Sequence, residues 1–411
     1  FELEFLAVAS PSKCAMLLSS EGDPDALDIP TPRTYREANQ GSTYVHAVPP
    51  PRTNVVDGMW IFKVKRPPGS PPVFKARYVA RGFSQREGFD FFHTFTLTPK
   101  MTTLRVLLHI AAQRDYELHS LDFSTSFLQA CIHKEILLRR PPGFTGTFPP
   151  GTQWSLRRPV YGLRQAPREW HDMLRITLAY PGFRPSSANP SLFVRRGSTP
   201  FFFLVYVKYL VFATAYRAAL TEVLQRFRPQ FSITQPTPIA VNHRLTDPFP
   251  DELFESSGPY AELVGCLMYL MTCTPLSILS HFVATMRHRP MHWMAAVRLA
   301  KHLSTTSGVW LVLGGRQPVV LTGHCDSSYA DDVETQLSTQ RHCFSLGAGA
   351  VSWRFTRSSS VAQSSAEAEI YAGAMAAQEL RWLTFLLTDL GKQPCSAPTL
   401  FTDNKAMILL C

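Results

Sequence analysis

The sequence has no Cys-x-x-Cys pair, and its eight cysteines are spread singly along 411 residues. That spacing predicts neither a zinc ribbon nor the disulfide framework of a small secreted domain, and it favours a reducing compartment. The nearest groupings of histidine with cysteine are His324-Cys325 and His342-Cys343. Adjacent side chains in a strand point to opposite faces, so neither pair is expected to hold one metal ion.

Long apolar runs are also missing. The most apolar stretch, residues 201–213, contains Lys208 and is well short of the ~20 residues that a membrane-spanning helix needs. No basic segment precedes an apolar stretch after Phe1, so the sequence predicts neither a signal peptide nor membrane association. Because the chain lacks an initiating methionine and stops at Cys411 inside a helical pattern, we expect it to be a fragment of a longer protein.

Acidic residues are the minority among the charged side chains. Lysine and arginine number 41 against 31 aspartates and glutamates, which gives a net charge of +10 and a pI near 9.3. This balance favours polyanionic partners such as nucleic acids. With 45% hydrophobic residues the chain can bury two or three cores, whereas its 33 prolines indicate many loops or a degraded sequence.

Local patterns predict a mixture of strands and helices. Residues 60–65 and 74–81 are rich in β-forming side chains and flank a proline-rich turn, which indicates a hairpin with a basic edge. Apolar residues at helical spacing over 103–113 lead into a strand at 117–122 that ends in a carboxylate. The apolar stretch 201–213 predicts one long buried strand or a pair of strands. Further predicted elements are helices over 168–178, 260–272, 292–305 and 366–391, and a strand over 399–402.

Seven sequence blocks carry a resemblance to a known family. Four of them come first, at 74–85, 121–128, 140–144 and 161–170. In order and spacing these four resemble the reverse transcriptase of copia-type LTR retrotransposons. The other three resemble the ribonuclease H part of the same Pol polyprotein, and they lie at 325–332, 364–372 and 402–406.

The resemblance implies an α+β fold. Its parts are a right-hand polymerase with fingers and palm, a helical connection, and an α/β ribonuclease H-like domain. The implied segments are a loose leader over 1–55, a reverse transcriptase over 56–245, a connection over 246–318 and a truncated ribonuclease H-like domain over 319–411.

The resemblance also assigns polymerase roles to individual residues. Asp122 matches the first of the carboxylates that hold two Mg²⁺ (or Mn²⁺) ions, although a lone aspartate at a strand end is ordinarily a cap or turn residue. Phe127 matches an aromatic steric gate against a ribose 2′-hydroxyl, and taken alone it is a core residue. Lys75 and Arg77 are the expected phosphate contacts of the hairpin, whose alternative is a solvated strand face. Gly162 matches a small residue beside the template and nucleotide, or it is an ordinary turn glycine.

One family feature is replaced in this sequence. The other two polymerase carboxylates of the family lie in a Tyr-x-Asp-Asp hairpin, and the matching stretch here is Tyr206-Val207-Lys208-Tyr209. Lys208 brings an ammonium group to the place where divalent cations would bind, and two metal ligands are lost. Asp122 alone cannot hold two ions, so we expect polymerase activity to be absent.

In the last segment, the resemblance implies a second metal site that hydrolyses RNA. Asp326, Glu369 and Asp403 match three of its carboxylates, and the fourth would lie beyond the end of the sequence. Glu367 competes for the helical position, but residues two apart on a helix diverge by about 200°, so only one of the two can face the metal ions. The acidic pair at 331–332 is expected in a solvated loop.

The implied function is that of the RNA-directed DNA polymerase and ribonuclease H region of a copia-type Pol polyprotein. Its partners would be an RNA template, a DNA primer and an RNA–DNA hybrid, inside cytoplasmic virus-like particles. Two alternatives stay open: a non-catalytic nucleic-acid-binding remnant, and a pseudogene product without activity.

Overall fold

The computed structural model describes most of the chain on either side of one long gap. The described residues are 43–65, 73–94, 99–123, 126–142, 148–179, 182–197, 200–206, 209–227, 237–238, 311–315, 317–332, 335–347 and 349–410. The helices predicted over 260–272 and 292–305, with residues 246–310 of the predicted connection, lie outside these ranges. Within the described ranges, no helix combines the length and the apolar composition that crossing a membrane requires.

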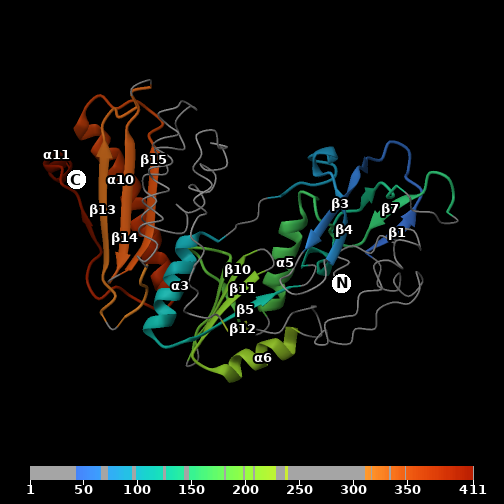
Figure 1. Ribbon diagram of the computed structural model, residues 1–411, viewed down its shortest axis with the longest axis horizontal. Coiled ribbons are helices and arrows are strands. Elements are labelled where there is room, and N and C mark those ends of the chain that lie inside the picture. Colours follow the sequence, from blue (N-terminus) through green and yellow to red (C-terminus); the bar gives the residue numbers. More distant parts are fainter. Residues whose placement is uncertain are drawn as a thin grey trace.

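A six-stranded central sheet forms the middle of the molecule (Figure 1). The apolar stretch predicted as one strand or two folds back on itself as an antiparallel hairpin, and the strand predicted at 117–122 pairs beside it. The strand order is β12 (Thr237–Pro238), β5 (Glu117–Asp122), β11 (Tyr209–Thr214), β10 (Phe201–Tyr206), β9 (Leu192–Arg195) and β8 (Arg184–Pro185).

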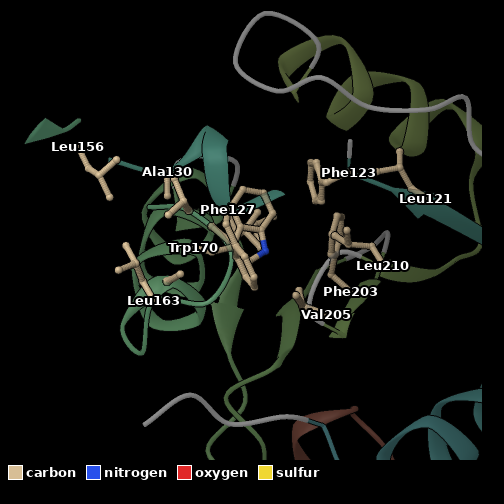
Figure 2. Packing of buried hydrophobic residues seen from close by; sticks show 14 of the residues in the cluster. Leu121, Phe123, Phe127, Ala130, Leu156, Leu163, Trp170, Phe203, Val205 and Leu210 are labelled. Carbon is tan, nitrogen blue, oxygen red and sulfur yellow. The ribbon is translucent and has the colours of Figure 1, made fainter. Parts of the chain in front are cut away.

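Both faces of the central sheet are apolar, which explains why β10 shows no alternation of polar and apolar residues. Phe201, Phe203 and Val205 belong to a core shared with the helices α5 (Ala166–Ala179) and α6 (Arg217–Phe227). Figure 2 shows this packing, with Phe203 and Val205 on the sheet side and Trp170 of α5 among the clustered side chains. The alternate residues of β10 belong to a different core, because successive side chains of a strand point to opposite faces.

That second core contains the helix α3 (Met101–Gln113), which begins two residues before the predicted helix at 103–113 and ends at the same residue. Phe202 and Leu204 of β10 join Leu107 and Ile110 of α3, and neither helix residue has any exposed surface. The same cluster also includes residues of the C-terminal part of the chain. Figure 1 shows α3 lying between the central sheet and the sheet of that C-terminal part. Each fully buried leucine or isoleucine contributes about 1.5–3 kcal/mol.

The C-terminal sheet has four strands and one long helix across it. Three strands form an antiparallel meander and the last joins the first in parallel. The order is β15 (Gly349–Arg357), β14 (Thr339–Leu346), β13 (Leu321–Ser328) and β16 (Thr399–Phe401). The helix is α10 (Ser365–Asp389), close to the predicted 366–391, and α11 (Lys405–Leu410) follows β16.

A smaller N-terminal sheet and a separate hairpin complete the described structure. The sheet order is β1 (Tyr44–Ala47), β7 (Gln153–Leu156), β6 (Ile136–Leu138) and β2 (Val55–Val56). The predicted hairpin is present as β3 (Gly58–Lys65) and β4 (Val73–Ala80). Two single-turn elements are η1 (Gly82–Ser84) and α4 (Ser126–Gln129).

The loose leader predicted over 1–55 is wrong for its last part. Strand β1 pairs along its whole length with β7, and Tyr44 stacks on the buried Trp154 with ring centroids 4.0 Å apart. The pairing partner of β1 lies more than a hundred residues further along the chain, so no local pattern reveals it. Tertiary pairing therefore orders a stretch whose own sequence suggests a loop.

Polar side chains of α3 bind the C-terminal part. Thr102, Arg105 and His109 lie three and four residues apart and therefore share one helix face. Their partners are the Ser352 hydroxyl, the Val351 carbonyl and the Gly314 amide. The Arg105 guanidinium also lies 3.6 Å from the centroid of the Trp353 ring. Burial lowers the pKa of His109, which keeps its Nδ1 available to accept the Gly314 amide proton.

Asp389, the last residue of α10, fastens this helix to the loop between β8 and β9. One carboxylate oxygen accepts hydrogen bonds from the Ser186 hydroxyl at 2.8 Å, from the Ser187 amide and hydroxyl at 2.9 Å each, and from the Ala188 amide at 3.3 Å. The other oxygen accepts from Arg196 at 3.2 Å. Burial alone would raise the pKa of Asp389, but these hydrogen bonds outweigh it and the pKa is lowered.

Replacing Asp389 with asparagine should weaken the attachment of the C-terminal sheet. Because charge-assisted hydrogen bonds are the strong ones, we expect Asp389→Asn to lower the free energy of unfolding by about 2–3 kcal/mol at pH 7. A carboxylate with a lowered pKa stabilises the fold above its unfolded pKa of about 3.9, and the difference between the two proteins should vanish as the pH falls through the lowered value.

The measurement is urea unfolding at several pH values. Asp172→Asn is the control, because the ion pairs of Asp172 with Arg168 and Arg175 lie on the partly exposed surface of α5, and their loss should change stability by about 0.5 kcal/mol or less. Equal effects of the two substitutions at pH 7 would contradict the attachment.

Candidate functional site

Three carboxylates meet at one edge of the C-terminal sheet. Asp326 lies near the end of β13, Glu369 in the second turn of α10, and Asp403 just after β16. One ligand oxygen from each residue lies within 4.8 Å of the other two. Parallel pairing sets His324 beside Phe401, and two more residues along the same register bring Asp403 beside Asp326. The helix crossing the sheet supplies the third group.

Glu369 is the buried member of the cluster, with 7% of its surface exposed. Its Oε1 accepts a hydrogen bond from the Ser327 amide at 3.2 Å, while its Oε2 is buried without a hydrogen-bond partner. Burial raises the pKa of Glu369, and the negative charges of Asp326 and Asp403 raise it further. The neighbouring Cys325 thiol has its pKa raised to about 11, mainly by burial and further by the negative charge of Glu369.

The structure separates Glu369 from its rival two residues earlier. Glu367 accepts the Tyr371 hydroxyl at 2.6 Å and the Gln363 amide at 2.7 Å, while its own amide donates to the Ser364 hydroxyl. This is a helix-capping arrangement that satisfies donors left free at the start of α10. Glu367 therefore stabilises the helix end and lies outside the carboxylate cluster.

The acidic pair at 331–332 differs from its prediction. Instead of a fully solvated aspartate, Asp332 forms an ion pair with Arg357 at 2.7 Å, and 15% of its side chain is exposed. It also accepts a hydrogen bond from the Thr335 hydroxyl. The reason is that β15 ends at Arg357, which lies beside the loop although it comes 25 positions later in the sequence.

Arg341 is a site residue that the sequence pattern did not reveal. It lies directly opposite Asp326 in the β13–β14 ladder, and its Nε is 3.0 Å from Oδ2 of Asp326. Finding it requires the antiparallel register of the two strands, because nothing in the local sequence links the two positions. The cluster therefore brings together three acids and one cation.

At the central sheet and the β3–β4 hairpin, the structure gives backbone positions for two of the predicted polymerase residues, Asp122 and Lys75. Asp122 ends β5 and pairs directly with Tyr209, the first residue of β11. The side chains of Asp122 and Lys75, and the whole of Lys208, lie outside the described part of the chain, so their roles stay predictions. Lys75 pairs through its backbone with Lys63 of β3.

Three of the predicted residues gather around Tyr161. The Phe127 ring lies 4.7 Å from the Tyr161 ring and is buried, and the Arg77 guanidinium lies 5.9 Å from the same ring. Gly162 follows directly, with a φ of +93° that favours glycine. A Cβ on Gly162 would lie 1.9 Å from the carbonyl oxygen of Ala80, the last residue of β4. Gly162 is thus a tight junction between the hairpin and α5.

The chain is similar in sequence and in fold to known proteins. Residues 42–241 match the family model described as reverse transcriptase (RNA-dependent DNA polymerase). This part of the chain belongs to the reverse transcriptase family. The chain is also 30% identical over 410 residues to the Retrovirus-related Pol polyprotein from transposon RE2 of Arabidopsis thaliana, and 28% identical over 390 residues to that from transposon TNT 1-94 of Nicotiana tabacum.

These alignments cover 88% and 81% of the chain but 28% and 29% of the two polyproteins, so the chain spans less than a third of the relatives' length. Among solved structures, a foamy viral protease-reverse transcriptase in complex with dsDNA aligns with a TM-score of 0.51 at 12% identity. That alignment covers 91% of this chain and 74% of the viral one, and it shows a shared fold. The expected resemblance to copia-type Pol polyproteins and the reverse transcriptase fold are confirmed.

Gly162 offers a direct test of the junction in the reverse transcriptase domain. We expect Gly162→Ala to destabilise the protein by about 3 kcal/mol, because the added methyl group overlaps the Ala80 backbone and the residue must keep a positive φ. The matched control is Gly88→Ala, since Gly88 also has a positive φ but has nothing within 4 Å of its Cβ position. It should lose only about 1 kcal/mol in thermal or urea unfolding. Similar losses in both variants would show that backbone strain alone matters.

Proposed function

We propose that the C-terminal sheet with α10 is a ribonuclease H-like unit that hydrolyses the RNA strand of an RNA–DNA hybrid, and that the reverse transcriptase domain has lost polymerase activity. The observation that carries the first half is the convergence of Asp326, Glu369 and Asp403 within 4.8 Å. Three carboxylates so close repel one another. Because this repulsion lowers the stability of the folded protein, the arrangement favours a role as metal ligands.

The donor set fits a hard divalent cation. All three groups offer carboxylate oxygens, the ligands that Mg²⁺ and Mn²⁺ prefer, and the buried Oε2 of Glu369 has no other partner. When bound, Mg²⁺ or Mn²⁺ would activate water and stabilise charge on a phosphodiester. Asp326, Glu369 and Asp403 would hold the ion, and the Ser327 amide would keep Glu369 oriented through its 3.2 Å hydrogen bond.

The second half rests on the replaced hairpin. Reverse transcriptases generally use divalent metal ions, and Lys208 and Tyr209 offer no carboxylate to hold one. Tyr209 lies directly opposite Asp122 in the ladder, so the replacement falls beside the one matching acid. A positive charge there opposes cation binding as well as removing ligands.

The proposed partners are nucleic acids. The net charge of +10 favours a polyanion, and the matching family's description as an RNA-dependent DNA polymerase favours an RNA template, a DNA primer or an RNA–DNA hybrid. The same charge, with the replaced polymerase acids, supports the second candidate, a binding remnant without catalysis. That remnant would bind a hybrid without Mg²⁺, with an affinity that falls steeply as salt rises.

Cleavage of a labelled RNA–DNA hybrid tests the hydrolase. We expect the purified full chain to cut the RNA strand in Mg²⁺ or Mn²⁺, and Asp326→Asn and Glu369→Gln to reduce the rate at least about a hundredfold by removing a ligand. Glu367→Gln is the matched control, because it removes the same charge two residues away on α10 and should keep most of the rate. If the folded protein binds the hybrid but does not cut it, the binding remnant is the better description.

Primer extension tests the polymerase. On an RNA template with a DNA primer, we expect no extension above background in either metal ion, because a single aspartate cannot hold two ions. A copia-type polymerase with its paired aspartates intact serves as the positive control on the same template. Extension at the rate of that control would refute the loss of activity.

A further inference from the structure

The carboxylate cluster contains its own cation. We propose that Arg341 is a built-in counter-ion that holds Asp326 in the metal-free protein, so that a divalent ion must compete with the guanidinium and binds more weakly than the three acids alone would allow. This inference rests on the proposed function, because it concerns the metal affinity of the same site.

Strand geometry fixes Arg341 in this position. Asp326 and Arg341 are directly opposed residues of an antiparallel pair, so their side chains leave the same face of the sheet. Three groups hold the guanidinium there: the Asp326 carboxylate with Nε and Oδ2 3.0 Å apart, the Ser328 hydroxyl, and the Phe355 ring with its centroid 5.9 Å away. Contacts from β13 on one side and from the Phe355 ring of β15 on the other define the place of this side chain.

The charge of Arg341 reaches the rest of the cluster. Burial and the neighbouring aspartates raise the pKa of Glu369, whereas the positive charge of Arg341 acts in the opposite direction. Arg341 therefore relieves part of the repulsion among the three acids. The same positive charge opposes the approach of a second cation, since both act on the same carboxylates.

The guanidinium leaves the site by moving. Arginine stays protonated at any ordinary pH, so titration does not remove its charge. About a third of the Arg341 side chain is already exposed, at 36%, and the paired Asp326 side chain is 46% exposed. On this proposal, metal entry requires the partly exposed Arg341 side chain to rotate away from Asp326 toward solvent.

Isothermal titration of Mn²⁺ into the full chain tests the competition. We expect Arg341→Gln to bind Mn²⁺ on the order of tenfold more tightly than the unchanged protein, and the difference should shrink in high salt. Arg341→Lys keeps the charge and should stay within about threefold of the unchanged protein.

The matched control is Arg354→Gln. Arg354 lies on β15 opposite His342, which puts it on the other face of the sheet from Arg341, and its side chain is exposed. The substitution makes the same change in net charge and should alter the Mn²⁺ affinity by less than about twofold.

Thermal unfolding provides a second measurement on the same variants. Without metal, Arg341→Gln should melt below the unchanged protein, because the repulsion among the acids is no longer relieved, and added Mn²⁺ should raise its melting temperature by the larger amount. Equal or weaker Mn²⁺ affinity in folded Arg341→Gln would overturn the inference, even if the unchanged protein cleaves the hybrid. Absence of Mn²⁺ binding in all variants would overturn both the inference and the proposed hydrolase.

Discussion

The two-sided burial of α3 is the interaction on which the arrangement of the described parts depends. Leu107 and Ile110 have no exposed surface and lie in one apolar cluster that includes side chains of the central sheet and of the C-terminal sheet. A helix that fills two cores at once cannot shift toward one sheet without leaving a gap against the other. Trp382 of α10 adds contacts between the two parts of the chain, since its indole donates to the Ala188 carbonyl at 2.7 Å and Lys100 lies over its ring. The reverse transcriptase domain and the proposed hydrolase are therefore held in a fixed relation by packing.

The two candidate sites differ in the acidic residues they bring together. In the C-terminal sheet, three carboxylates remain together, with Glu369 raised in pKa by its burial and by its neighbours. At the central sheet the residue paired with Asp122 is Tyr209, which offers no second carboxylate. Repulsion among carboxylates reduces the stability of a folded protein, and a cation bound between them would relieve it. The C-terminal sheet therefore gathers three acids, whereas the described residues of the central sheet pair Asp122 with no second acid.

Much of the fold can be predicted from the sequence, because its strands and helices have strong local patterns. The strand at 117–122 and the helix at 366–391 follow from apolar runs and periodicity, whereas for 201–213 the sequence leaves open one strand or two and the structure shows a hairpin. Strand β1 does not, because its order comes from pairing with β7 far along the chain. The helical periodicity of α3 predicts one buried face, whereas Arg105 on another face is also buried, at 6% exposed, against Trp353.

The candidate site also has residues that the sequence reveals and one that it does not. The resemblance picks out Asp326, Glu369 and Asp403 one by one, and the parallel pairing of β13 with β16 explains why they meet. Arg341 escapes sequence reasoning because its importance lies in the register of β13 with β14, which no single segment encodes.

The parallel strand β16 also sets the order in which the carboxylate cluster is completed. The antiparallel meander β13–β15 joins neighbours in the sequence, so its contacts close short loops. Strand β16 can join β13 only after α10 has crossed the sheet, because a parallel pair needs a long crossover connection. Asp403 therefore joins Asp326 and Glu369 last, because β16 comes after the crossing helix in the sequence. The sheet and helix can form before the full repulsion among the three acids exists, so the least favourable contact of the unit is made on a scaffold that is already folded.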